Sequence, residues 1–145
     1  MYEAKFGIAW DDKYKIGDEN IDAQHKMLFD LLSVLVSQCI DGSCAEMLQD
    51  TLDFLVNYTL QHFSDEESLQ NMYNFPGFKR HMRMHEEFKL LVGDLVQRFN
   101  ENGSSRQLCD DVNKIIIRWL VDHILQEDRK IGQHIRHVSA SPVSV

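Results

Sequence analysis

The chain has 145 residues, of which 43% are hydrophobic and 26% are charged, and its formal net charge is −8. This length and composition fit one globular domain with an ordinary core and exclude a disordered chain. The negative charge argues against nucleic acid or an anionic membrane surface as a partner. No apolar run reaches the roughly 18 residues of a membrane span, and the first residues lack the apolar segment of a secretory signal, so we expect a cytoplasmic protein.

Two helices are predicted in the first half of the chain, after an N-terminal arm over residues 1–19. The arm carries apolar and aromatic side chains that we expect to pack across the bundle. The first helix covers about residues 20–38, where apolar residues recur at the three- and four-residue spacing of an amphipathic helix. Ser43 and Glu46 match a capping box, so we expect the second helix to begin there. The arm's apolar side chains are Tyr2, Phe6, Ile8, Trp10 and Tyr14.

Two further helices are predicted in the second half. Pro76 suits the first turn of the third helix, and Ser104 with Gln107 makes a second capping-box match at the start of the fourth. Four amphipathic helices with short connections predict an all-α, antiparallel, up-down-up-down bundle over about residues 20–137. The tail over residues 138–145 is expected to fray.

The three cysteines are odd in number and form no C-x-x-C pair. In a cytoplasmic protein such cysteines are usually reduced. We therefore interpret Cys39, Cys44 and Cys109 as thiols that fill the core rather than as disulfide partners or metal ligands.

Polar residues occupy six positions where the helical spacing predicts apolar ones. An unpaired buried polar group costs a few kcal/mol, so six of them would consume much of the roughly 5–15 kcal/mol by which a domain is stable. We therefore expect these groups to bind something. They are His25, His62, Glu66, His81, His85 and His123.

The order of the helices predicts that these six positions lie at one height. His25, His81 and His85 are near the starts of the first and third helices, and the other three are toward the ends of the second and fourth. In an antiparallel bundle those starts and ends meet at the same end. Imidazoles and a carboxylate that converge from four helices predict a metal site. By contrast, His134 and His137 near the C-terminus are interpreted as surface residues.

The number of histidines favours two metal ions, because five imidazoles exceed what one ion takes from a protein. Two six-coordinate ions offer about twelve positions. Five imidazoles, two bridging carboxylates and one shared oxygen atom would fill all but one of them. The open position would bind a small molecule.

Spacing alone leaves the second bridging carboxylate open. Glu127 is four residues after His123 and lies on the same face of an ideal helix. Asp128 is five residues after His123 and lies about 140° further round. Ideal helix geometry therefore favours Glu127.

The chain resembles the hemerythrin family, specifically its bacterial branch, in four segments that read "IDAQHKMLF", "HFSDEE", "HMRMH" and "WLVDHILQED". The family pattern is one histidine, then HxxxE, HxxxH and HxxxxD on successive helices, and this chain matches every position. The resemblance spans roughly residues 7–134 and implies one hemerythrin-like domain over residues 1–145. It also favours Asp128 over Glu127.

The resemblance implies two non-haem iron ions bridged by an oxo or hydroxo group and by two carboxylates. One ion would bind three histidines and be saturated, and the other would bind two histidines and keep an open position for O₂. The implied ligands are His81, His85 and His123 for the saturated ion, His25 and His62 for the other, and Glu66 and Asp128 as bridges.

A carrier function is favoured over catalysis by the ligand set. Five histidines and two carboxylates supply few anionic ligands, which disfavours cleavage of the O–O bond. We predict a protein, not an enzyme, that binds O₂ reversibly for carriage, storage or delivery. The alternative is a sensory module whose O₂ or redox state a signalling partner detects, and a peroxidase or nitric oxide-handling enzyme is the least favoured reading. By the same resemblance, the residues that line the O₂ pocket are Leu28, Phe63, Trp119, Leu120 and Ile124.

Overall fold

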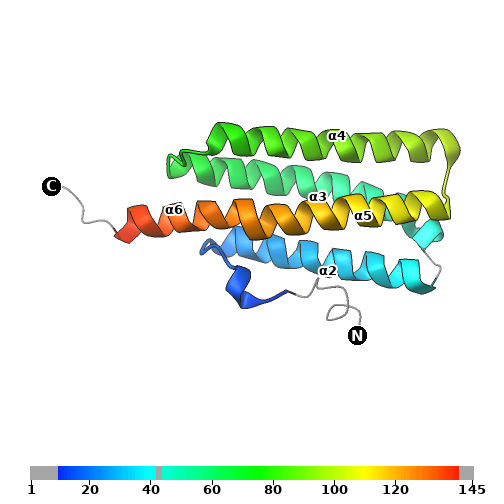
Figure 1. The fold of residues 1–145 in the computed structure, drawn as a ribbon, viewed down its shortest axis with the longest axis horizontal. Helices are drawn as coiled ribbons and strands as arrows, with labels where there is room; N and C mark the ends of the chain where they lie inside the picture. Colours follow the sequence, from blue (N-terminus) through cyan, green and yellow to red (C-terminus); the bar gives the residue numbers. More distant parts are fainter. Residues whose placement is uncertain (1–9, 42–43, 141–145) are drawn as a thin grey trace.

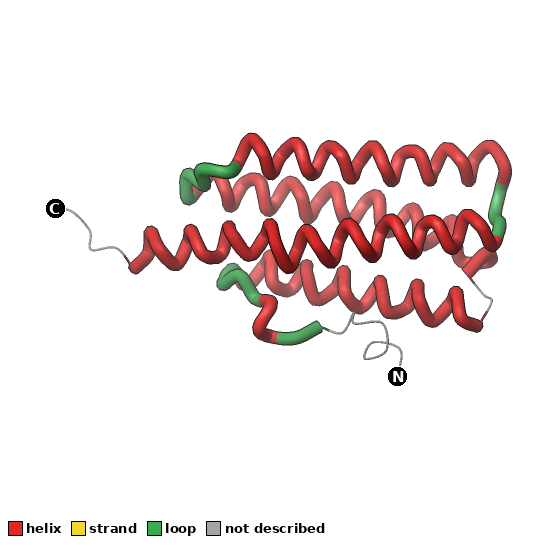
Figure 2. Tube along the Cα trace, in the orientation of Figure 1, coloured by secondary structure: helices red, strands yellow, loops and turns green. Residues whose placement is uncertain are grey.

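The computed structural model describes residues 10–41 and 44–140, and within these ranges it consists of helices and their connections (Figures 1 and 2). Four rods run alternately in opposite directions (Figure 1), and the first and third each contact the second and fourth. The predicted all-α, antiparallel four-helix bundle is therefore confirmed. The rods are α2 (Glu19–Asp41), α3 (Cys44–Met72), α4 (Phe78–Asn102) and a continuous fourth rod of α5 (Arg106–Asp122), η2 (His123–Asp128) and α6 (Arg129–Ala140).

The side chains of the predicted apolar seams that the structure describes lie mostly on the buried faces of the helices. Residues three and four apart share one helix face, so they turn inward together. Cys109 joins this core as a buried free thiol, whereas the side chains of Cys39 and Cys44 lie outside the described part. No described helix has the length and apolarity needed to cross a membrane. The main cluster includes Leu48, Leu52 and Leu55 from α3, Phe88, Val92 and Leu95 from α4, and Leu108, Val112 and Ile116 from α5.

The N-terminal arm is held to the bundle by two aromatic side chains and by one carboxylate. The ring centroids of Trp10 and Tyr14 lie 5.6 and 5.7 Å from that of Phe29, next to the short helix η1 (Asp12–Tyr14). The two oxygens of Asp22 accept the backbone N–H groups of Ile16 and Gly17 at 2.7 and 3.2 Å. The predicted packing of the arm is thus confirmed for Trp10 and Tyr14, while Tyr2, Phe6 and Ile8 lie outside the described residues.

Two predicted helix starts are wrong by one or two residues. The N-cap of α5 is Ser105 and not Ser104, because the Ser105 hydroxyl accepts the Leu108 N–H at 3.0 Å. Pro76 lies in the turn before α4 rather than in its first turn. Here Gly77 is the N-cap, and its carbonyl accepts the His81 N–H at 2.9 Å. The Ser43 capping box lies outside the described residues.

The last described helix, α6, continues through Ala140, past the residue at which the tail was predicted to begin. Ile131 is fully buried in a second apolar cluster at this end of the bundle, which holds α6 in place. His134 is half-buried rather than a surface residue, and its Nε2–H donates to the Tyr73 carbonyl at 2.8 Å. His137 is exposed, as predicted.

The cap assignment predicts different effects for two neighbouring serines. Ser105→Ala removes the acceptor for an N-terminal N–H of α5, so the free energy of unfolding should fall by about 1 kcal/mol. Ser104→Ala removes no cap and should leave stability nearly unchanged. Urea denaturation of both variants measures the difference. Equal losses, or a larger loss for Ser104→Ala, would contradict the assignment.

Two helical glycines should respond in opposite ways to alanine. A Cβ on Gly132 would lie 2.6 Å from the Ile16 carbonyl oxygen, and Asp22 holds that backbone in place, so Gly132→Ala should destabilise the protein. A Cβ on Gly93 meets nothing within 4 Å. Gly93→Ala should therefore raise the free energy of unfolding by about 0.5–1 kcal/mol, because alanine favours helix. Thermal unfolding of both variants tests this, and a stable Gly132→Ala would refute the close approach.

Candidate metal centre

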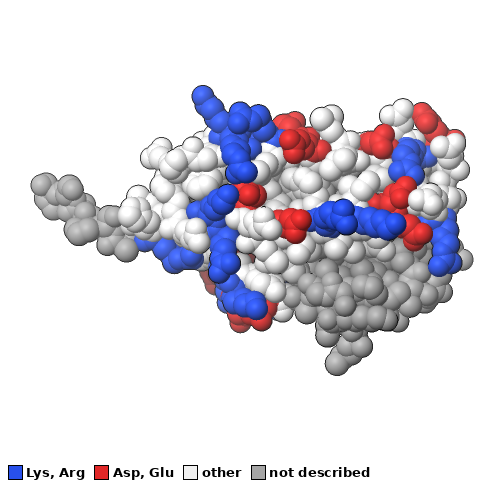
Figure 3. Space-filling model, in the orientation of Figure 1, with Lys and Arg blue, Asp and Glu red and all other residues white. Residues whose placement is uncertain are grey.

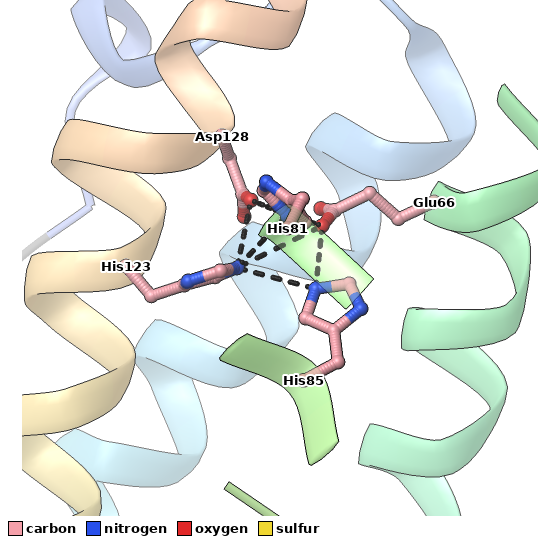
Figure 4. A group of neighbouring side chains, drawn as sticks. All are labelled: Glu66, His81, His85, His123 and Asp128. Atoms are coloured by element: carbon pink, nitrogen blue, oxygen red, sulfur yellow. Dashed lines mark hydrogen bonds and ion pairs between the residues drawn. The ribbon is translucent and has the colours of Figure 1, made fainter. Parts of the chain in front are cut away.

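Seven polar side chains converge inside the bundle at the end where α2 and α4 begin, and Figure 4 shows five of them. They form two groups, and within each group one ligand-type atom per residue lies within 4.8 Å of all the others. The groups share two carboxylates. The larger group is Glu66, His81, His85, His123 and Asp128, and the smaller is His25, His62, Glu66 and Asp128.

In the larger group, three imidazole nitrogens face one another. The Nε2 atom of His123 lies 3.0 Å from that of His81 and 3.2 Å from that of His85. Glu66 Oε1 lies 2.8 Å from His81 Nε2 and 3.0 Å from His85 Nε2. Three ring nitrogens this close cannot satisfy one another with hydrogen bonds alone, because a neutral imidazole offers one N–H. Nitrogen and oxygen lone pairs around one point are the surroundings that a metal cation requires.

The smaller group uses the other oxygen of each carboxylate. His25 Nε2 lies 2.9 Å from Asp128 Oδ2 and 3.4 Å from Glu66 Oε2. His62 Nε2 also lies 3.4 Å from Glu66 Oε2. In the larger group, by contrast, Asp128 Oδ1 is the oxygen that lies 3.0 Å from His81 Nε2. Each carboxylate therefore presents one oxygen to each group.

Several of these buried atoms have no hydrogen-bond partner despite the short distances. They lie close to other polar atoms, but not in the directions that a hydrogen bond needs. An unsatisfied buried polar atom costs about 1–3 kcal/mol, so a set of them needs a compensating ligand. Cations bound by nitrogen and oxygen fit this requirement. The atoms are both ring nitrogens of His25, Oε2 of Glu66, and both carboxylate oxygens of Asp128.

The carboxylates hold protons on the neighbouring imidazoles. Burial lowers the pKa of His25, but the nearby Asp128 and Glu66 carboxylates outweigh it and raise that pKa to about 9. Burial likewise lowers the pKa of His123, and the same carboxylates raise it to about 10. Burial raises the pKa of each carboxyl group, but the surrounding histidines outweigh burial and hold both pKa values well below the usual range. A field that retains protons also attracts cations, and an entering cation must displace those protons.

Asp128, and not Glu127, points into this layer because the fourth rod is not an α-helix there. Residues 123–128 form the π-helical turn η2. Its i→i+5 hydrogen-bond pattern brings residues five apart nearly into line, so His123 and Asp128 share a face. Ideal α-helix geometry favoured Glu127, and the π turn is the reason that it misleads.

Glu127 instead lies near the surface between two basic side chains. Its carboxylate accepts from Arg80 at 2.6 Å and from Lys130 at 3.2 Å, and its side chain is 15% exposed. Burial raises the pKa of Glu127, but these two hydrogen bonds outweigh it and lower that pKa. Figure 3 shows Lys and Arg side chains gathered on this face at the end where α4 begins. Glu127 therefore has structural partners outside the cluster.

Two polar residues that the sequence analysis missed contact the outer nitrogens of the cluster. Glu67 Oε2 lies 2.8 Å from Nδ1 of His85, and Gln24 Oε1 lies 2.7 Å from Nδ1 of His62. Neither residue is on an apolar seam, so periodicity does not reveal them. Only their side-chain chemistry could have indicated them, because a metal-binding imidazole needs a hydrogen-bond acceptor for its second nitrogen, and both side chains carry one.

The two aromatic residues of the predicted O₂ pocket pack against histidines of the larger group. The Phe63 ring stacks on His85 with centroids 3.7 Å apart, and Trp119 stacks on His123 at 4.4 Å. Trp119 is half-buried and, with His123, lines a groove of about 500 Å³ beside α4. The remaining three, Leu28, Leu120 and Ile124, are buried. That these five residues line an O₂ pocket stays a prediction.

Comparison with known proteins supports the resemblance read from the four segments. The sequence profile described as "Hemerythrin HHE cation binding domain" matches residues 16–135. A bacteriohemerythrin from Stenotrophomonas maltophilia (strain R551-3) is 29% identical over 130 residues, which are 89% of this chain and 82% of the relative. A myohemerythrin from Riftia pachyptila is 32% identical over 131 residues, covering 89% of this chain and 94% of the relative.

The π turn predicts opposite outcomes for two adjacent acidic residues. Asp128→Asn should lower the amount of metal bound per chain, because it removes the negative charge that both groups share. Glu127→Gln should leave metal content nearly intact, with at most a small loss of stability from its surface ion pairs. Elemental analysis after loading with iron measures both. Metal loss in Glu127→Gln with full loading of Asp128→Asn would show that the wrong carboxylate was assigned.

Proposed function

The chain belongs to the hemerythrin family, and on this premise we propose that its seven converging side chains bind two non-haem iron ions at which O₂ binds reversibly. The observation that best supports this proposal is the sharing of carboxylates. Glu66 and Asp128 each present one oxygen to the larger group and the other oxygen to the smaller group. That arrangement suits two adjacent cations bridged by both carboxylates. When bound, the iron pair supplies the electrons and the coordination position that O₂ requires.

The two proposed ion positions differ in the number of protein ligands. The larger group offers five side chains and the smaller group four. With one further oxygen atom shared between the ions, a six-coordinate ion would be complete in the larger group and would lack one ligand in the smaller. We therefore assign the O₂ position to the ion held by His25 and His62.

The protein's further contribution is to exclude water from this layer. Along α2, His25 lies between the buried residues Ile21 and Leu28, and along the fourth rod Asp128 lies between the buried Ile124 and Ile131. These flanking residues belong to two separate apolar clusters, one on each side of the polar layer. A dry site suppresses side reactions that need water or protons. Such protection suits a protein that must release its ligand unchanged.

Carriage, storage or delivery of O₂ is the role that we propose, rather than catalysis. The ligand set has five imidazoles and two carboxylates, and few anionic ligands stabilise highly oxidised metal poorly. Di-iron bundle proteins in which a Glu from each of two helices joins Glu-x-x-His pairs from the other two have the opposite ratio. The apolar side chains beside the cluster can accommodate O₂, and they have no acidic proton to deliver to it.

The proposal predicts a metal count and a reversible spectral change. Protein loaded with iron should contain about two irons per chain. When the reduced, colourless protein meets air, a visible absorption band should appear, and it should fade when O₂ is removed under argon. Elemental analysis and absorption spectroscopy measure these outcomes. One zinc per chain, no metal in a folded protein, or an irreversible change in air would each refute reversible O₂ binding at two irons.

A further inference from the structure

We propose that Glu67 and Gln24 are positioning residues that add to the difference between the two ion positions. Glu67 strengthens the ion position formed by His81, His85 and His123, which we call the three-histidine position. Gln24 orients His62 at the second ion position. This inference rests on the proposed function, because it concerns cations held by the same side chains. It goes further in assigning an order of loading, with the three-histidine position filled first.

The contact of Glu67 fixes which nitrogen of His85 carries the hydrogen. An ionised carboxylate only accepts hydrogen bonds, so Nδ1 of His85 must donate to Glu67 Oε2 across their 2.8 Å separation. The inner Nε2 then presents a lone pair to the cluster, 3.0 Å from Glu66 Oε1. The Phe63 ring, stacked within 4° of parallel on the imidazole, holds the plane of the ring.

A carboxylate partner does more than orient the imidazole. Negative charge at Oε2 draws the Nδ1 proton outward and makes Nε2 a more basic ligand. Glu67 is only 21% exposed, so water screens this charge incompletely. His85 itself is fully buried. The three-histidine position therefore has an additional negative charge directly behind one of its ligands.

The corresponding partner of His62 is neutral. Gln24 Nε2 donates to Asp65 Oδ2 at 2.6 Å, which turns the amide oxygen toward His62 Nδ1 at 2.7 Å. That oxygen can only accept, so His62 also presents its Nε2 lone pair inward. Asp65 accepts two further hydrogen bonds, from Gln61 and Asn20. Its charge is therefore shared among three donors, and the group that contacts His62 Nδ1 is a neutral amide.

The two partners predict separate effects on two binding steps. Loss of an outer-shell partner commonly costs about 10- to 100-fold in metal affinity. Removing the Glu67 charge should weaken the first and tighter step, and removing the Gln24 acceptor should weaken the second. A purely structural role would instead lower both steps together.

The test is a stepwise titration of the full metal-free chain with Co²⁺ against a competing chelator, without O₂. Glu67→Gln keeps the shape of the side chain and should weaken the first step about tenfold, leaving the second unchanged. Gln24→Leu should weaken the second step about tenfold and leave the first unchanged. Glu86→Gln is the matched control, because Glu86 follows His85 in the chain but lies outward, 3.0 Å from Lys89. It removes the same charge and should change neither step.

A proton spectrum separates charge from packing. In the zinc-loaded protein, the His85 Nδ1 proton should resonate far downfield, as expected for a hydrogen bond to a carboxylate, and Glu67→Gln should move it upfield. The inference is overturned if that resonance does not move, if Glu67→Gln titrates like Glu86→Gln, or if both inner variants weaken the same step. If the wild-type chain binds no pair of ions at all, the proposed function fails as well.

Discussion

Burial of a charged layer inside an apolar bundle is the constraint on which the rest of this structure depends. Seven polar side chains lie at most 5% exposed between two apolar clusters. Without a compensating charge, such a layer would cost more than an ordinary domain can tolerate. When metal is absent, protons on the imidazoles can supply this compensating charge, since the carboxylates retain them there. Cations satisfy the same atoms more completely, so folding and metal binding draw on one set of contacts.

Much of the fold and of the cluster could be predicted because helical periodicity is strict. The seams of α3 and α4 turn inward as units, and this places His62, Glu66, His81 and His85 without further information. Antiparallel order then decides which ends meet. These two rules together account for the layer, because every position in it except Asp128 continues an apolar repeat.

What could not be predicted depends on local geometry that periodicity does not encode. The π turn η2 moves Asp128 inward, and only the family resemblance pointed to it. Two adjacent serines compete for the α5 cap, and backbone detail selects Ser105. Glu67 and Gln24 lie off the seams, so no pattern of apolar residues marks them. His134 donates a hydrogen bond to the backbone carbonyl of Tyr73, in a turn far away in the sequence.

The π turn also decides where the fourth rod can change in length. An i→i+5 turn contains one residue more than an α-helical turn, and each residue of an α-helix rotates the chain by about 100°. Deleting one residue between His123 and Asp128 would leave an α-helical turn, in which residues four apart share a face, so Asp128 would stay in the layer. Deleting one residue between Asp128 and Gly132 would instead rotate Gly132 away from the Ile16 backbone and disturb the docking of the arm. The rod should therefore tolerate the loss of one residue within η2 better than the loss of one residue in the turn that follows it.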